Sequence, residues 1–248
     1  MNRFQKLYNY YNWGGRFLTD PYHLRTQKLN EWETEKAPKR FDIINHLLQS
    51  FDRPTTYLEI GVRNPADNFN KINATTKYSV DPGIEFKENP VDFKVTSDEF
   101  FKRLREGNFL TADTLFDVIF IDGLHLAEQV DRDIENALEF IKEDGFIVLH
   151  DCNPQTEWHA REEHNYTISP AGQQWNGTTW KAFLKWRYLP IIQSCCVDTD
   201  WGVGIISKTR HLAPAPQTTN PFYEFKVLEK NRVDQLGLVD FEELKKAL

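Results

Sequence analysis

The sequence is poor in several features that would point to particular classes of protein. Three cysteines in 248 residues, Cys152, Cys195 and Cys196, show no metal-ligand spacing and are an odd number for a disulfide framework, so we expect buried free thiols. No apolar run approaches the roughly 20 residues needed to cross a bilayer. The opening residues MNRFQKLY lack the apolar core of a secretory signal. We therefore expect a cytoplasmic protein with no membrane span.

Positive charge is also scarce, because the net charge at pH 7 is -7. Such a balance gives no electrostatic basis for gripping a phosphate backbone, so nucleic acid is not the expected partner. The Gly-x-Gly fingerprint of nicotinamide enzymes is missing as well, since Val62, Arg63, Asn64 and Pro65 follow Gly61.

What the chain does contain is a series of short apolar strands that end in acidic residues. The segments are Thr56–Val62 with Glu59 and Gly61, Tyr78–Pro82 with Asp81, and Phe116–His125 with Asp122. An open parallel sheet binds its ligand in the crevice at the carboxyl ends of its strands, so these acidic groups are expected to line one site. Asp81 lies 20 residues after Gly61, a spacing suited to a carboxylate that binds two ribose hydroxyls.

The apolar periodicity predicts alternating strands and helices. Strands are expected over 56–62, 77–81, 92–95, 116–121, 146–149, 191–197 and 201–207. Helices are expected over 39–51, 67–72, 126–142 and 179–187, from Ser97, and from about Asp240, with Glu143-Asp-Gly145 closing the one over 126–142. This order predicts an α/β fold with a Rossmann-like, doubly wound, mostly parallel seven-stranded sheet whose last two strands form an antiparallel hairpin.

The expected organisation has three parts. Residues 1–52 form an N-terminal helical extension, rich in aromatic residues, that packs over the core or over a neighbouring subunit, so a homo-oligomer is anticipated. Residues 53–210 form the main domain, with a long irregular loop over 152–178. Residues 211–248 are a tail with a terminal helix.

Four motifs resemble those of the class I S-adenosylmethionine-dependent methyltransferases: Leu58–Gly61, Val80–Pro82, Thr96–Glu99 and Phe116–Asp122, within about residues 55–151. Ile121–His125 with Val148–Asp151 most resembles the metal-dependent O-methyltransferase branch, which includes small-molecule and antibiotic-sugar methyltransferases. One departure is that Asn64–Asp67 stands where many relatives carry a second glycine, which implies a different hold on the methionine end of the cofactor.

The resemblance implies roles for individual residues. Glu59, Gly61, Asp81, Ser97 and Asp122 are the expected cofactor-binding residues, and Asp122, His150 and Asp151 are the expected ligands of a divalent cation, Mg²⁺ or Mn²⁺. A histidine ligand favours Mn²⁺ or another transition metal, whereas Asn153 could complete an oxygen-rich set. The expected catalytic residues are His125, as the base, with His150 and Asp122. His125 as a helix cap and His150 as a buried structural histidine stay open as alternatives.

The implied activity is methyl transfer from S-adenosylmethionine to a hydroxyl of a small molecule, a sugar or glycosylated metabolite. A catalytically inactive Rossmann-fold binding protein and a nicotinamide-dependent oxidoreductase are the alternatives. In the long loop, His159, Glu162, Glu163 and His164 are interpreted as a solvated charged lid in preference to a second metal cluster. Trp158, Trp175 and Trp180 are interpreted as sugar-stacking or packing residues. Asp198 and Asp200 are explained by a turn.

Overall fold

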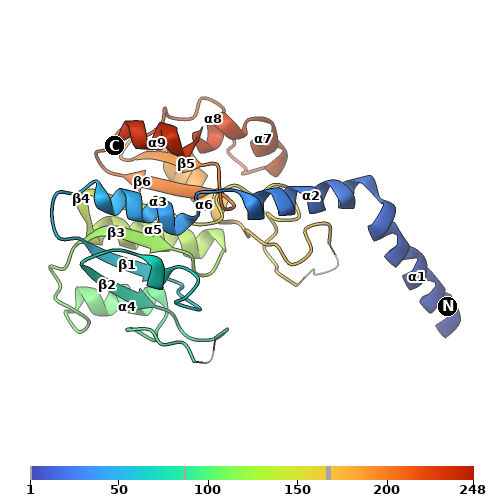
Figure 1. Ribbon diagram of the computed structural model, residues 1–248, viewed down its shortest axis with the longest axis horizontal. Helices are drawn as coiled ribbons and strands as arrows, with labels where there is room; N and C mark the ends of the chain where they lie inside the picture. Colours follow the sequence, from blue (N-terminus) through green and yellow to red (C-terminus); the bar gives the residue numbers. More distant parts are fainter. Residues whose placement is uncertain (1, 87, 166–168) are drawn as a thin grey trace.

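The computed structural model describes residues 2–86, 88–165 and 169–248. Its strands are β1 (Thr56–Ile60), β2 (Thr76–Val80), β3 (Phe116–Ile121), β4 (Ile141–Leu149), β5 (Gln193–Val197), β6 (Val203–Ser207) and β7 (Leu238–Val239). They form one sheet in the order β2-β1-β3-β4-β6-β5-β7. Only β6 runs against its neighbours β4 and β5, and the other pairs are parallel. The predicted mostly parallel seven-stranded sheet is therefore confirmed (Figure 1).

The described helices are α1 (Arg3–Thr19), α2 (Pro21–Glu35), α3 (Arg40–Gln49), α4 (Ser97–Arg105), α5 (Ala127–Phe140), α6 (Thr179–Arg187), α7 (Phe225–Lys230), α8 (Arg232–Leu236) and α9 (Phe241–Ala247), with a short 3₁₀ turn, Phe69–Lys71. None of them is both long enough and apolar enough to cross a membrane.

Helices cover both faces of the sheet, because the strand residues alternate between two cores. Ile119 of β3 and Ile147 of β4 pack in one core with α4, α5 and α6. Their neighbours Phe120 and Val148 pack in the other core with α3 and α9. All six residues of β3 are buried, as expected for a strand covered on both faces.

The helix expected over 126–142 ends earlier than its periodicity predicts. Phe140 is the last residue of α5, and Ile141 already has an extended backbone and pairs with Phe116 at the start of β4. Glu143-Asp-Gly145 therefore does not cap the helix but lies within β4, where the register to β3 shifts. A β-branched, fully apolar Ile141 is stabilised more by sheet pairing than by another helical turn.

The seventh strand is not the one expected from the sequence. Residues 92–95 form only an isolated bridge between Phe93 and Val80, because the Asp92 carboxylate accepts hydrogen bonds from the Ser79 backbone N–H and hydroxyl. The seventh place is taken by β7 at the opposite edge of the sheet, which pairs with β5. Residues 67–72 form a 3₁₀ turn in place of a helix, and Thr96 caps α4.

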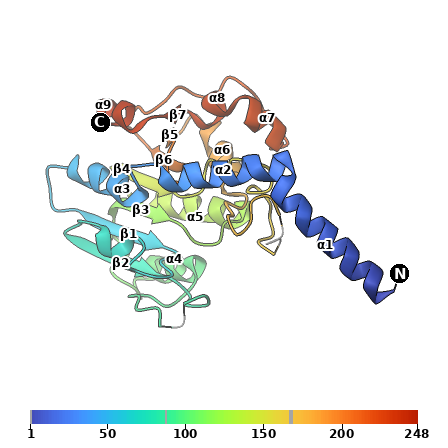
Figure 2. The ribbon, with the colours of Figure 1, turned by 45° about the vertical axis from the view of Figure 1, so that its right-hand side comes forward.

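The N-terminal helices leave the body of the molecule. In both ribbon views α2 runs outward from α3, and α1 turns away beyond it at Asp20 and Pro21 (Figures 1 and 2). α2 stays attached to the body because its Asn30 and Glu33 contact the loop after β4 and the turn between β5 and β6. No residue of α1 is buried.

Candidate active site

Four parallel strands end in register at one edge of the sheet. Ile60 pairs with both Val80 and Ile121, and Ile121 pairs with Leu149. Each of these strands is followed by one of the predicted site residues: Gly61 after β1, Asp81 after β2, Asp122 after β3 and His150 after β4. These residues therefore stand in a row across the carboxyl edge, where an open parallel sheet binds ligands.

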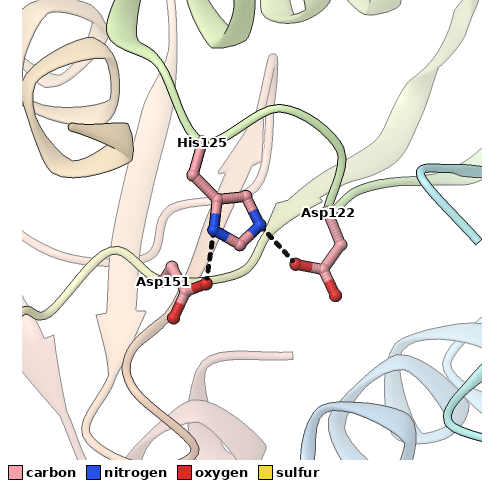
Figure 3. Close-up of side chains that lie close together, drawn as sticks. All are labelled: Asp122, His125 and Asp151. Atoms are coloured by element: carbon pink, nitrogen blue, oxygen red, sulfur yellow. Dashed lines mark ion pairs between the residues drawn. The ribbon is translucent and has the colours of Figure 1, made fainter. Parts of the chain in front are cut away.

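His125 lies between two carboxylates at this edge. Its Nε2 is 3.3 Å from Asp122 Oδ1, and its Nδ1 is 3.1 Å from Asp151 Oδ2 (Figure 3). His150 approaches the same two oxygens, with its Nδ1 3.2 Å from Asp122 Oδ1 and 3.3 Å from Asp151 Oδ2. Two imidazoles thus share two carboxylates.

The shared carboxylates set the protonation of both imidazoles. Burial alone would lower the pKa of His150, but the charges of Asp151 and Asp122 outweigh it and hold that pKa well above its ordinary value. The pKa of His125 is raised in the same way, against its burial, by Asp151 and Asp122. Burial would raise the pKa of Asp122, whereas His150 and His125 hold it well below its ordinary value. Both shifts favour the protonated form of the imidazoles, and a protonated imidazole cannot accept a proton.

Arg40 and Asp200 complete the cluster on the inner side of His150, and neither was expected from the sequence. Arg40 Nη1 is 3.2 Å from Asp200 Oδ2 and 3.3 Å from His150 Nε2, and Arg40 Nε is 3.7 Å from Asp122 Oδ2. The Asp200 carboxylate also accepts the Arg40 backbone N–H at 3.0 Å. The turn between β5 and β6 therefore does not fully explain Asp200, because its side chain faces the candidate site.

The charges of this cluster balance when both imidazoles are protonated. The three carboxylates of Asp122, Asp151 and Asp200 then face the Arg40 guanidinium and two imidazolium rings. Burial would raise the pKa of Asp200, but its hydrogen bond and charge contact with His150 and the charge of Arg40 lower it. A buried group of charges is tolerated only when its members are paired in this way.

Asp151 and Asp200 both have left-handed backbone conformations, with φ of 61° and 46°. A non-glycine residue with positive φ is strained, and such strain persists where the surroundings hold the residue in place. Asp151 is held by Asn176, whose Nδ2 donates to Asp151 Oδ1 at 2.8 Å. Asp151 Oδ2 remains directed at the two imidazoles. The loop after β4, through Asn176, therefore orients the carboxylate.

The residues at this site fit a divalent cation. Among the described residues, one group of His, Cys, Asp and Glu side chains has ligand atoms that all lie within 4.8 Å of one another, and it consists of Asp122, His125 and Asp151. His125 Nδ1 is buried and makes no hydrogen bond, its contact with Asp151 being an ion pair. This group contains His125 where the expected set has His150, although His150 contacts the same two carboxylates. Two carboxylate oxygens and an imidazole suit Mn²⁺ or a similar ion.

The predicted cofactor residues of β1 have structural partners of their own. Glu59 is buried, and its Oε2 accepts hydrogen bonds from the Tyr57 hydroxyl at 2.6 Å and from Asn68 Nδ2 at 2.8 Å, so it orders the loop after β1. Burial raises the pKa of Glu59 to about 7. Gly61 has a φ of 85°, and a Cβ there would lie 2.4 Å from the Asp122 carbonyl oxygen. Glycine at this position allows β1 and β3 to end close together.

Asp81, the carboxylate expected to bind the ribose, follows β2 at this edge. It is half-buried, and its oxygens accept the backbone N–H groups of Arg63 at 2.9 Å and Gly83 at 2.6 Å as well as the Asn89 side-chain amide. These donors fix the orientation of the carboxylate. Ser97, the fourth expected cofactor residue, is the first residue of α4, and its hydroxyl accepts from Gln129 at 3.1 Å.

The loop over 152–178 lies against the cluster. The Trp175 ring stacks on His125, with ring centroids 5.3 Å apart and planes 21° apart. His159 is fully buried and bonded to Thr156 and Asn30, so it does not belong to a solvated lid, whereas Glu162, Glu163 and His164 are exposed as expected. Among the described residues these four form no second metal cluster, and Trp180 is a buried core residue. Burial and the charge of Arg161 lower the pKa of His159 to about 4.

Comparison with known proteins gives one family match. Residues 63–152 match a family model described as a methyltransferase domain. The match covers less than half of the chain, and it contains Asp81 and the His125 cluster but begins just after Gly61. No curated protein sequence matches the chain. Over these residues the chain is similar to a methyltransferase domain, which agrees with the class predicted from the sequence.

Several solved structures are also similar. An O-methyltransferase from Bacillus cereus in complex with SAH is 13% identical, with a TM-score of 0.48, over 77% of this chain and 92% of that one. A putative O-methyltransferase from Klebsiella pneumoniae is 15% identical, with a TM-score of 0.44, over 76% and 90%. The MycE methyltransferase of the mycinamycin pathway, in complex with Mg, SAH and mycinamycin VI, is 16% identical, with a TM-score of 0.42, over 75% and 52%.

Proposed function

We propose that this protein is a class I S-adenosylmethionine-dependent methyltransferase that transfers the methyl group to a hydroxyl of a small molecule, a sugar or glycosylated metabolite. The observation that carries the proposal is the pair of imidazoles held by Asp122 and Asp151 beside the cofactor edge of the sheet. Oxygen is the acceptor favoured by such a site, because a hydroxyl needs both polarisation and a base before it attacks a sulfonium methyl.

In this proposal the cofactor lies over the ends of β1 and β2, with its ribose on Asp81 and its adenine toward Ser97. The acceptor enters from the side of the loop over 152–178, next to Trp175, whose ring stacks on both His125 and His164. Asp122 stands between the two ligands, since it ends β3.

The proposed cation ligands are Asp122, His150 and Asp151, and the proposed base is His125, the more exposed of the two imidazoles. A divalent cation bound to the two carboxylates would polarise the acceptor hydroxyl and offset the negative charge that keeps His125 protonated. His125 then takes the hydroxyl proton at Nε2 or Nδ1, while Arg40 and Asp200 keep His150 in place. The triad of Asp122, His125 and Asp151 supports the alternative in which His125 is the ligand.

Two alanine variants separate these roles. We expect His125→Ala to bind Mn²⁺ nearly as tightly as the parent but to lose roughly 10²–10⁴-fold in turnover, the usual contribution of a general base. His150→Ala should lose Mn²⁺ affinity as well, measured by calorimetry. If His125→Ala loses the cation and His150→Ala keeps it, the two histidines exchange roles.

The acceptor class is tested by incubating the protein with S-adenosylmethionine carrying a labelled methyl group, Mn²⁺ and matched pairs of glycosides and their aglycones. Label on an oxygen of the glycoside, located by mass spectrometry, is the expected result. Label only on aglycones would replace the sugar with another hydroxyl acceptor. Calorimetric binding of NAD in place of S-adenosylhomocysteine would contradict the cofactor, and binding without any transfer across a broad panel would favour a binding protein.

A further inference from the structure

α1 carries a row of large apolar side chains that no other described part of the chain covers. Its seventeen residues form a projecting arm, and none of them is buried (Figures 1 and 2). Phe4, Tyr11 and Leu18 are 82%, 81% and 77% exposed, and Leu7 and Tyr8 are also more than half exposed. Contiguous apolar exposure of this kind marks an interaction surface in a folded protein.

The spacing of this row is that of a helix pair. Phe4, Leu7, Tyr11, Gly14 and Leu18 follow one another at intervals of three, four, three and four residues, which is the heptad pattern of a coiled-coil seam. At 3.6 residues per turn, Lys6 and Arg16 lie on the opposite side of the helix, so the seam itself carries no charge.

Two consecutive glycines interrupt the arm, and the fold of one chain does not require them. A Cβ added at Gly14 or Gly15 would meet nothing within 4 Å. Each glycine costs about 1 kcal/mol relative to alanine within a helix, and an isolated helix of about this length is marginal in water. The glycines therefore weaken the free arm and leave a gap in its seam, which a partner helix can fill.

We propose that α1 pairs antiparallel with α1 of a second copy of this chain, with Tyr11 of each copy at the two-fold axis. In this register a residue and its counterpart have numbers that add to 22. Leu7 then faces Gly15 of the second copy, Tyr8 faces Gly14, and Phe4 faces Leu18. Each large side chain meets a small one or an apolar one, so the arm is complementary to itself.

Area favours this partner. Aromatic side chains bury about 150–250 Å² each, so three aromatic and two leucine side chains from each arm, with about half of their area covered, bury on the order of 1,000–1,200 Å² in total, near the lower limit of specific interfaces. The arm holds Arg3, Lys6 and Arg16 and no acidic residue, so the pairing of two arms depends on apolar contact, and Lys6 and Arg16 remain on its outer side. The register places Arg3 beside Asp20 of the second copy, whose carboxylate is 42% exposed.

A cysteine at the proposed axis tests the register directly. The three native cysteines are buried, so Tyr11→Cys adds the one accessible thiol among the described residues. Under mild oxidation of the full chain we expect a disulfide-linked dimer on a non-reducing gel. The control is Asn12→Cys, one residue further along but about 100° around the helix, which should remain uncrosslinked. Equal crosslinking of both variants, or none of Tyr11→Cys, would overturn the proposal.

A second test does not depend on destabilising the helix. Gly15→Leu raises the helix propensity of α1 but occupies the space meant for Leu7 of the second copy, so we expect at least a tenfold weaker dimer by sedimentation velocity, with helix content kept. Adding Leu7→Ala should restore part of the affinity. A parent protein that stays monomeric at tens of micromolar contradicts the pairing. A second contradictory result is binding of the parent to phosphatidylglycerol vesicles, with tighter binding by Gly15→Leu. That result would assign the arm to a membrane surface.

Discussion

At the scale of single residues, the candidate site is built from groups whose protonation depends on their neighbours. The carboxylates and imidazoles at the ends of β3 and β4 could be anticipated, because the strands are visible in the sequence and the ends of neighbouring parallel strands meet. Arg40 and Asp200 could not. They come from the first turn of α3 and from a tight turn 160 residues further along the chain, and neither belongs to a motif.

Asp81 is expected to determine cofactor affinity. Asp81→Asn keeps an oxygen for only one of the Arg63 and Gly83 N–H groups, which bond to different carboxylate oxygens, and it loses the charge that favours hydrogen bonds from ribose hydroxyls. We expect the binding of S-adenosylhomocysteine to weaken by about 1.5–3 kcal/mol, the usual worth of hydrogen bonds to a charged group. Glu85→Gln, an exposed carboxylate in the same loop, is the control for calorimetry. Unchanged affinity in Asp81→Asn would show that the ribose binds elsewhere.

Glu59 is expected to make stability fall as the pH rises. In the unfolded chain its pKa is the ordinary 4.5, whereas burial raises it to about 7 in the folded protein, so both states are protonated below pH 4.5. Between these values the unfolded chain releases its proton first, which favours unfolding by up to about 3 kcal/mol in total.

Glu59→Gln removes this dependence while keeping an oxygen for Tyr57 and Asn68. Urea unfolding of the parent and the variant at pH 4.5 and pH 7.5 measures the free energy of unfolding of each protein. The change with pH in the parent is compared with the change in the variant. This comparison is needed because Asp133, with a pKa raised to about 6 by burial, also makes the stability of both proteins fall as the pH rises. Parallel pH profiles would mean that Glu59 stays ionised in the fold.

At the scale of elements, the strands with continuous apolar runs were predictable and the marginal ones were not. β3 matches its predicted bounds because six consecutive buried residues leave no alternative. The strand expected over 92–95 fails because one side chain, Asp92, takes the hydrogen bonds that a strand would need. β7 has only two residues, and its pairing with β5 is decided by tertiary packing that local sequence does not reveal.

The link between α2 and the loop over 152–178 is expected to control access of the acceptor. Asn30 donates to the Ala171 carbonyl at 3.1 Å and accepts from His159 Nε2 at 2.8 Å, since His159 Nδ1 already accepts the Thr156 N–H. Asn30→Ala leaves a buried imidazole N–H without a partner, which costs about 1–3 kcal/mol.

Because this cost falls on the loop, we expect faster hydrogen exchange over the described part of the loop and a higher KM for the acceptor, with unchanged affinity for S-adenosylhomocysteine. Lys28→Ala, exposed on the same helix, is the control. If the loop of Asn30→Ala is as well protected from hydrogen exchange as the loop of the parent, the link does not control the loop.

At the scale of the whole molecule, the sheet with helices on both faces fixes the carboxyl edge, while the long loop, α2 and the β5–β6 turn close over it from three separate parts of the chain. A ligand bound at this edge therefore touches elements that separate on unfolding. Its binding free energy adds to the stability of the fold as a whole.

This linkage gives a test of the cation that needs no acceptor. If Mn²⁺ binds at Asp122 and Asp151, a concentration one hundred times its dissociation constant should stabilise the folded protein by about 2.7 kcal/mol and raise its unfolding temperature. Asp151→Asn should lose most of this shift, although its stability without the cation also changes, so each protein is compared with itself. Asp113→Asn, at an exposed position, should keep the full shift. An unfolding temperature of the parent that does not respond to Mn²⁺ or Mg²⁺ would remove the cation from the mechanism and leave His125 and His150 to act on the acceptor alone.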